Sequence, residues 1–158
     1  MKAIVYREYG SPDVLELEDI DKPPVKDNEV LVRVRAASVN RLDWHLMRGS
    51  PYISRLQVGL RKPKDTRVGV DYAGTVEAVG RNVTRFQPND QVFGGRSGAL
   101  AQYVVAKQDG AVALKPANVS FEQAGAVAIA ATTALQGLRD AGRLQTGDKV
   151  LINGASGG

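Results

Sequence analysis

The sequence predicts a mostly β domain, either a barrel or a sandwich, followed by the beginning of an α/β unit. Three observations support this prediction. Short segments with strand character recur at close spacing over about the first 115 residues. From Ser120 onward, the spacing of apolar residues becomes helical. An apolar segment then runs into a glycine-rich loop, LINGASGG, at residues 151–158.

The β part contains several segments that are typical of strands. The clearest is Glu29–Ala36, where valines alternate with arginines. This period of two indicates a strand with one buried and one solvated face. Turn-forming residues such as Gly10, Pro12 and Asp13 separate the segments. The segments expected to form strands are 2–6, 14–18, 29–36, 68–79, 91–94, 101–106 and 111–114.

A loop-rich stretch is expected from Ser38 to Thr66, because it contains Pro51, Gly59 and Pro63. Loops this long often carry function. Basic residues gather at its end, in the segment 55–67 with the sequence RLQVGLRKPKDTR. Because this segment lacks interleaved aromatic residues, it is interpreted as a solvated loop close to an anionic cofactor, not as a nucleic-acid site.

The helical part is predicted to begin at Ser120, with Gln123 at the spacing of a capping box. The helix extends over 124–141, and Gly142 is a stop signal. Beyond it, the apolar segment 149–153 has the composition of a strand buried in a parallel sheet.

Dinucleotides bind where a strand runs into glycines, because small residues let the backbone approach the pyrophosphate. Gly154, Gly157 and Gly158 supply such glycines after the apolar segment. Taken alone, the pattern is equally compatible with an ordinary turn. The helix and the ribose-reading residue that would distinguish the two are expected after residue 158.

Composition limits the kinds of protein and of site. Of the 158 residues, 43% are hydrophobic and 24% are charged, which predicts one well-buried domain or one and a half. The absence of cysteine excludes disulfides, thiolate nucleophiles, iron–sulfur clusters and Cys-ligated zinc, and a single histidine excludes a His-rich metal site. No secretory signal is visible, and the apolar run 126–131 is too short to span a bilayer. The protein is therefore expected to be cytoplasmic.

The order of these motifs resembles the medium-chain dehydrogenase/reductase superfamily, specifically its zinc-independent, quinone oxidoreductase-like branch (zeta-crystallin and its relatives). The resemblance covers the whole chain. The segments that carry it are MKAIVYREYG at 1–10, VRVRAASVN at 32–40, Asp43, GVDYAGTV at 69–76, PNDQVFG at 88–94, AQY at 101–103, ATTAL at 131–135 and DKVLINGASGG at 148–158.

The branch is identified by the residues that stand where zinc-dependent members carry metal ligands. Asn40 occupies the position of a cysteine ligand, and Val70 that of a histidine ligand. The four-cysteine lobe of those members has no counterpart. Two departures from the family pattern are Asn89, where a glycine is usual, and Arg41, where many relatives have proline.

The resemblance implies a fold and an activity. Residues 1–120 would form a GroES-like substrate domain, and residues 121–158 would begin a Rossmann dinucleotide-binding domain. The implied reaction is hydride transfer from NADPH, with NAD as the alternative, to a quinone or an α,β-unsaturated carbonyl compound without zinc. The full-length protein would be a homodimer, and the printed chain would be an inactive N-terminal portion. The composition of the basic segment and the shortness of the apolar run lead us to expect that it binds neither nucleic acid nor a membrane.

The resemblance also assigns roles to residues. Asn40 is expected beside the nicotinamide, and the alternative is that it only forms a local turn. His45 and Tyr52 are candidates for proton donation or substrate contact, and the alternative for both is ordinary packing. Thr133 would contact the nicotinamide carboxamide, or else bond back to a helix carbonyl. The pyrophosphate would lie on Gly154, Ala155, Ser156, Gly157 and Gly158.

Three neighbours of these residues are given structural roles. Asp43 is expected to order its loop through backbone N–H groups, and Trp44 and Met47 to contribute packing. Two alternative functions stay open. One is a non-catalytic binding module made as a short chain, and the other is an alcohol dehydrogenase that works without zinc.

Overall fold

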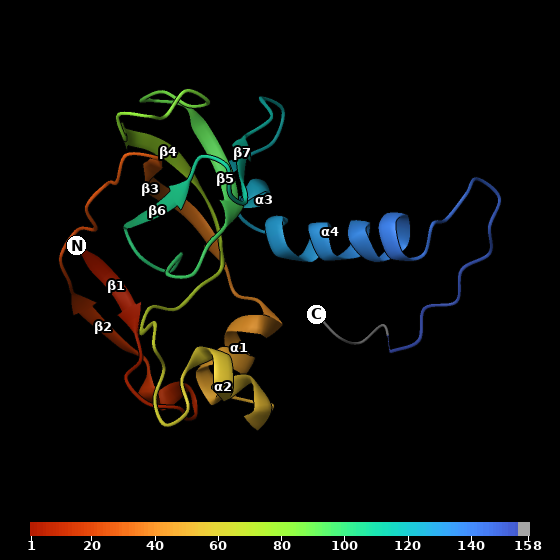
Figure 1. Cartoon of the computed structure of the whole chain (residues 1–158), viewed down its shortest axis with the longest axis horizontal. Coiled ribbons are helices and arrows are strands. Elements are labelled where there is room, and N and C mark those ends of the chain that lie inside the picture. The colour runs from red at the N-terminus through yellow and green to blue at the C-terminus, as the bar shows by residue number, and fades with distance from the viewer. Residues whose placement is uncertain (155–158) are drawn as a thin grey trace.

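A computed structural model describes residues 1–154 and shows a curled antiparallel sheet with the strand order β6-β3-β4-β5-β7 (Figure 1). This arrangement confirms the predicted β domain. The two central strands, β3 and β4, are the longest and pair with each other. The strands of this sheet are β3 (Glu29–Ser38), β4 (Asp71–Val79), β5 (Gln91–Gly95), β6 (Tyr103–Lys107) and β7 (Val112–Leu114).

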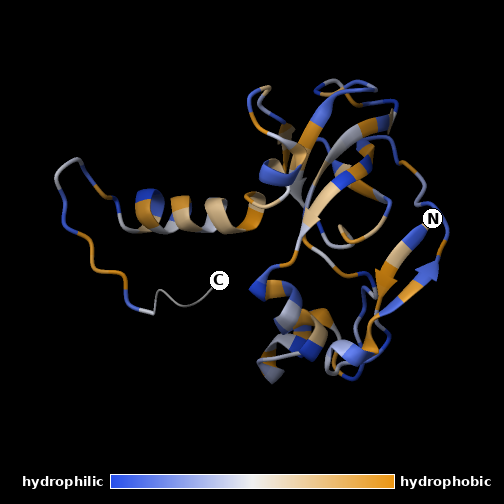
Figure 2. Cartoon of the chain, turned by 180° about the vertical axis from the view of Figure 1, so that it is seen from behind, coloured by the Kyte–Doolittle hydropathy of each residue, from blue (hydrophilic) through white to orange (hydrophobic). Residues whose placement is uncertain are grey.

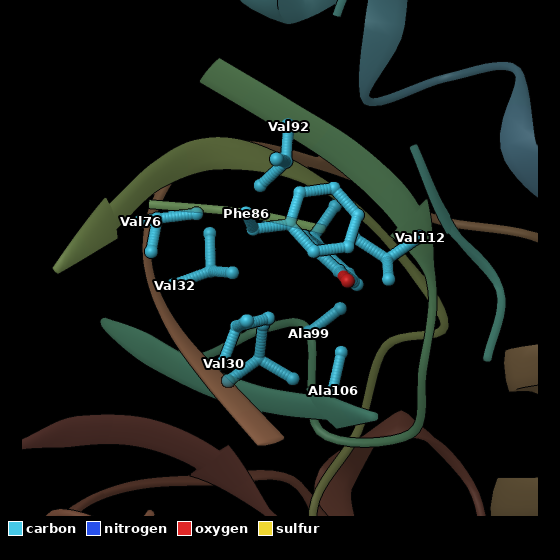
Figure 3. Packing of buried hydrophobic residues seen from close by; sticks show 10 residues of the cluster. Val30, Val32, Val76, Phe86, Val92, Ala99, Ala106 and Val112 are labelled. Atoms are coloured by element: carbon cyan, nitrogen blue, oxygen red, sulfur yellow. The ribbon is translucent and has the colours of Figure 1, made fainter. Parts of the chain in front are cut away.

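The core lies inside the curl of this sheet. Val30 and Val32 on β3 are completely buried, as their alternation with arginines predicts, and they pack with Val76 and Val92 from the neighbouring strands (Figure 3). Gly74 lets β3 and β4 approach each other at a bulge, because a Cβ there would collide with a carbonyl oxygen of β3.

A separate hairpin consists of β1 (Lys2–Val5) and β2 (Glu16–Asp19). Both strands were expected. The second begins two residues later than the pattern indicates, because Pro12–Val14 forms the 3-10 helix η1 instead. Isolated bridges from Ala3 and Val5 connect the hairpin to the rest of the molecule.

The stretch expected to be a loop contains a helix, so that part of the prediction was wrong. Helix α1 spans Arg41–Arg48, starts where Asp43 accepts a hydrogen bond from the Asn40 N–H, and ends at Gly49 with φ +57°. A 3-10 turn, η2 (Tyr52–Ser54), and the short helix α2 (Arg55–Val58) follow. The three elements lie together beside the β1–β2 hairpin (Figure 1).

The predicted helical region is interrupted. Ser120 and Gln123 form the expected capping box at α3 (Phe121–Ala124). The chain then breaks before α4 (Ala128–Leu135), which continues as the π-helix η3 (Gln136–Ala141). Figure 1 shows α4 extending away from the sheet.

The predicted strand at 149–153 is wrong for this structure, which has no strand among those residues. Val150, Leu151 and Ile152 are exposed. A strand forms only with a hydrogen-bonded neighbour, and no part of residues 1–154 pairs with this segment. Within residues 1–154, no helix is both long enough and apolar enough to cross a membrane.

Candidate functional site

A hollow of about 630 Å³ lies between α1 and α4. It brings together three of the residues selected from the sequence, Asn40, His45 and Thr133, although Thr133 is far from the other two along the chain. Apolar side chains complete the wall. The lining residues are Asn40, Arg41, Leu42, His45, Ile129, Ala130, Thr133 and Ala134.

One buried carboxylate joins the two walls of this hollow. The Oδ1 atom of Asp71 accepts a hydrogen bond from the backbone N–H of Ile129, at 3.0 Å. Its Oδ2 atom accepts one from the Asn40 side-chain amide at 3.2 Å and one from the Ser38 hydroxyl at 3.4 Å. Asp71 is 0% exposed and forms no ion pair within residues 1–154. These bonds and the N-terminus of α4 therefore stabilise its charge.

Sequence reasoning missed this role of Asp71, which it used only as part of the motif GVDYAGTV. The usable signal was an acidic residue inside an otherwise apolar strand pattern. A buried carboxylate is costly unless it is hydrogen-bonded, so such a residue indicates a partner from elsewhere in the chain.

Asn40 lies immediately before α1, at the end of the loop that follows β3. Its side-chain N–H group donates to Ser38 Oγ and Asp71 Oδ2, both at 3.2 Å. Asn40 also forms a capping box with Asp43 at the start of α1, with its side chain facing the Asp43 N–H, and it lines the hollow. The side chain is therefore held in place by Ser38, Asp71 and the first turn of α1, at the edge of the hollow.

His45 presents a second polar group to the hollow. It is half-buried on α1, and its ring packs edge-to-face with Trp44, with the ring centroids 5.0 Å apart. Its Nδ1 atom is buried and has no hydrogen-bond partner among the described residues. Thr133 adds an exposed hydroxyl from α4. The hollow thus combines an amide, an imidazole and a hydroxyl with apolar walls.

The structure does not bring Tyr52 to this hollow. Tyr52 lies on η2, is 78% exposed, and stacks against the guanidinium group of Arg55, which lies 4.7 Å from its ring centroid. Gly154 is exposed, has φ +75°, and is not among the lining residues. Ala155, Ser156, Gly157 and Gly158 lie outside the described residues.

Asp43 orders the start of α1, as expected. Its Oδ2 atom accepts a hydrogen bond from the Asn40 N–H at 2.7 Å, while its Oδ1 atom is buried without a partner in residues 1–154. Burial raises the pKa of this carboxyl, and the nearby charge of Asp71 raises it further. Backbone N–H groups of Asn40 and Gly69 act in the opposite direction.

A smaller cavity of about 290 Å³ lies at α1 and includes Asp43 and Tyr6 in its lining. Burial is the main cause that raises the pKa of Tyr6 to about 12. Met47 is buried, which confirms its packing role, and Trp44 lies beneath the guanidinium group of Arg41 at 4.3 Å. No set of three or more His, Cys, Asp or Glu side chains within residues 1–154 is arranged to hold a metal ion.

Comparison with known proteins gives a consistent picture. Residues 26–117 match the family model described as the alcohol dehydrogenase GroES-like domain. The chain is 36% identical to 2-methylene-furan-3-one reductase of Solanum lycopersicum and 37% identical to quinone oxidoreductase of Sus scrofa. Each alignment covers 100% of this chain but only 42% and 46% of the respective relative.

A solved structure gives the same result. Escherichia coli quinone oxidoreductase, crystallised in complex with NADPH, superimposes with a TM-score of 0.78 at 26% identity. The match covers 89% of this chain and 41% of the Escherichia coli chain. The chain therefore spans less than half the length of these relatives.

Proposed function

The chain belongs to the medium-chain dehydrogenase/reductase superfamily, in its quinone oxidoreductase-like part, and on this premise we propose that the protein transfers hydride from NADPH to a quinone or an α,β-unsaturated carbonyl compound. Residues 1–120 are proposed to form the substrate domain. Residues 121–158 are proposed to begin the dinucleotide-binding domain, with Gly154, Ala155, Ser156, Gly157 and Gly158 at the pyrophosphate.

The observation that carries this proposal is the polar set around the hollow. A nicotinamide has a flat ring and a carboxamide that both donates and accepts hydrogen bonds. The side-chain amide of Asn40 and the hydroxyl of Thr133 suit such a carboxamide, and Ile129 and Ala130 offer an apolar surface to a ring. Asn40, Thr133 and Ile129 therefore fit the nicotinamide end of the cofactor.

The cofactor would supply the hydride, and the protein would position the acceptor and control protons. We propose His45 as the group that donates a hydrogen bond or proton to the acceptor oxygen, because its ring lies in the hollow. A quinone or enone suits this site, since its developing negative charge is delocalised. We propose that the reaction needs no zinc, because Asn40 and Val70 stand where zinc-dependent members carry a cysteine and a histidine ligand.

The first test is turnover by the longest form of the protein that the gene encodes. NADPH oxidation is followed by the loss of absorbance of the reduced nicotinamide, with a quinone, an enone and an aldehyde as acceptors. Oxidation with a quinone or enone is expected. Activity only with alcohols and NADP would favour the alcohol dehydrogenase, and no turnover with any of these would favour the non-catalytic module.

A pair of neighbouring threonines provides a matched test of the site. Thr133→Val removes the hydroxyl that lines the hollow and is expected to raise the KM for NADPH about tenfold, the value of one hydrogen bond. Thr132→Val makes the same change at an exposed position that does not line the hollow, and is expected to leave KM unchanged. Equal effects of the two variants would contradict the proposed role of Thr133.

A further inference from the structure

The segment 48–64 carries an exposed apolar strip that lies outside the hollow between α1 and α4. Tyr52, Ile53, Leu56 and Leu60 are 78%, 74%, 69% and 66% exposed. They come from η2, α2 and the turn that follows, and none of them lines the hollow between α1 and α4. Figure 2 shows strongly apolar and strongly polar residues intermixed on these short helices. We call these four residues the apolar strip.

All the charged residues of the segment 48–64 carry the same sign. Between Trp44 and Lys64 the sequence contains no acidic residue, but it contains five cations, Arg48, Arg55, Arg61, Lys62 and Lys64. None of the five forms an ion pair within residues 1–154. The net charge of the whole chain is +4, so this segment alone carries more positive charge than the entire protein.

The segment is held in a defined shape, with its apolar strip facing outward. Arg55 donates to the carbonyl oxygens of Gly49 at 2.9 Å and Arg48 at 3.2 Å, and its guanidinium group covers the ring of Tyr9. Tyr9 in turn donates to the carbonyl oxygen of Gly59, at 2.6 Å. These contacts hold the segment around its own backbone and leave most of the surface of Tyr52, Ile53, Leu56 and Leu60 exposed.

We propose that this surface binds the headgroup region of an anionic lipid bilayer. The apolar strip would enter the boundary between headgroups and acyl chains, with the ring of Tyr52 at the interface. Arg61 and Lys62, both exposed and without an ion pair in the described residues, would contact lipid phosphates and carboxylates. A bilayer can bind a surface that has no shape-matched groove. Its negative charge would attract Arg61 and Lys62, which form no ion pair in the described residues.

This inference departs from the expectation that the protein binds no membrane. That expectation rested on the absence of a long apolar segment, which bears on spanning a bilayer and not on lying against one. It also reassigns the basic segment 55–67, which was interpreted as a loop near the cofactor. The inference stands whether or not the proposed reductase activity is found.

Co-sedimentation with vesicles tests the proposal. The protein is mixed with vesicles of pure phosphatidylcholine or of phosphatidylcholine containing phosphatidylserine, at low and high salt. Sedimentation with the anionic vesicles is expected, with at least about tenfold weaker binding to the neutral ones and at high salt. Equal binding to both compositions, or no binding to either, would overturn the proposal.

Two matched pairs of variants locate the surface. Leu56→Asp and the double change Arg61→Glu/Lys62→Glu are each expected to weaken binding about tenfold or more. The controls are Leu17→Asp, a similarly exposed leucine on β2, and the double change Lys26→Glu/Lys107→Glu, which alters the charge equally at two exposed lysines outside the segment. Both should bind like the unmodified protein.

Two further measurements test whether a variant has lost its fold and whether the protein forms a dimer through the apolar strip. Because the altered residues are exposed, the circular dichroism spectra of all variants are expected to match that of the unmodified protein. Sedimentation velocity gives the oligomeric state. A dimer that Leu56→Asp converts into a monomer would show that a second copy covers the apolar strip, and would overturn the lipid assignment.

Discussion

The sheet and the C-terminal arm of this protein are built in opposite ways. Within the curled sheet, Val30, Val32 and Val92 have no exposed surface and touch partners from distant parts of the chain. Within the arm, from α4 to residue 154, no described residue of α4 or η3 is buried, and Leu151 is 92% exposed. The sheet supplies its own core, while the arm obtains its position from a few contacts at its start.

The candidate site lies where these two regions meet. The hydrogen bond from the Ile129 N–H to Asp71 ties the first turn of α4 to β4, and the side chain of Ile129 also lies close to Gly95 on β5. Stability and site geometry therefore depend on different residues. A change in the sheet core should unfold the domain, whereas a change at the junction should alter the site first.

The largest expected effect comes from the core. Phe86→Ala removes a buried ring from the cluster inside the sheet and is expected to lower the free energy of unfolding by about 3–5 kcal/mol. Leu138→Ala, at a 42% exposed position on η3, is expected to cost less than about 1 kcal/mol. Urea unfolding followed by circular dichroism measures both. A larger loss for Leu138→Ala would show that the arm packs more tightly than the exposure of its residues indicates.

The junction should show the next largest effect. Asp71→Ala removes the acceptor for Ile129, Asn40 and Ser38, and is expected to cost about 2–3 kcal/mol, because buried donors lose a charged partner. The loss should be local. Amide hydrogen exchange in α4 should accelerate, while the amides of β3 and β6 stay protected.

Asp71→Asn provides the control for this change. Its amide oxygen can still accept from the Ile129 N–H, so exchange in α4 should stay closer to that of the unmodified protein. Uniform acceleration across the sheet in Asp71→Ala would contradict the division between a stable sheet and a dependent arm.

Sequence reasoning worked well where local patterns and burial agree. The valines of β3 and the capping box at Ser120 follow from side-chain period and backbone capping, and both are observed. It failed where the outcome depends on a partner. The segment 149–153 looks like a strand but has nothing to pair with in the described residues, and α1 was hidden among the turn residues around it.

The residues of the candidate site also fall into some that the sequence predicted and one that it missed. Asn40, His45 and Thr133 were selected from the family resemblance, and the structure places all three around one hollow. Asp71, which joins the walls, was missed because its partners lie on three different segments that no local pattern connects. The catalytic and cofactor roles of these residues stay predictions.

A smaller effect is expected at Asp43. Because burial raises its pKa, the folded protein keeps the proton to a higher pH than the unfolded chain does. The resulting stability is fully present below the ordinary carboxyl pKa and is lost as pH rises through the raised value. Asp43→Asn should remove this loss, so its stability relative to that of the unmodified protein should increase as pH rises from about 4 to about 7. An unchanged pH profile would contradict the raised pKa.

The smallest expected effect concerns the buried Tyr72 hydroxyl and whether it has a hydrogen-bond partner. The Tyr72 hydroxyl is buried against the sheet and has no hydrogen-bond partner in residues 1–154, and burial raises its pKa. Tyr72→Phe keeps the ring and removes only this unpaired group, so it should change stability by less than about 0.5 kcal/mol or increase it slightly. Tyr9→Phe loses the 2.6 Å bond to Gly59 and should cost about 1 kcal/mol. If Tyr72→Phe costs as much as Tyr9→Phe in urea unfolding, the buried hydroxyl has a partner, and the core is more polar than its side chains indicate.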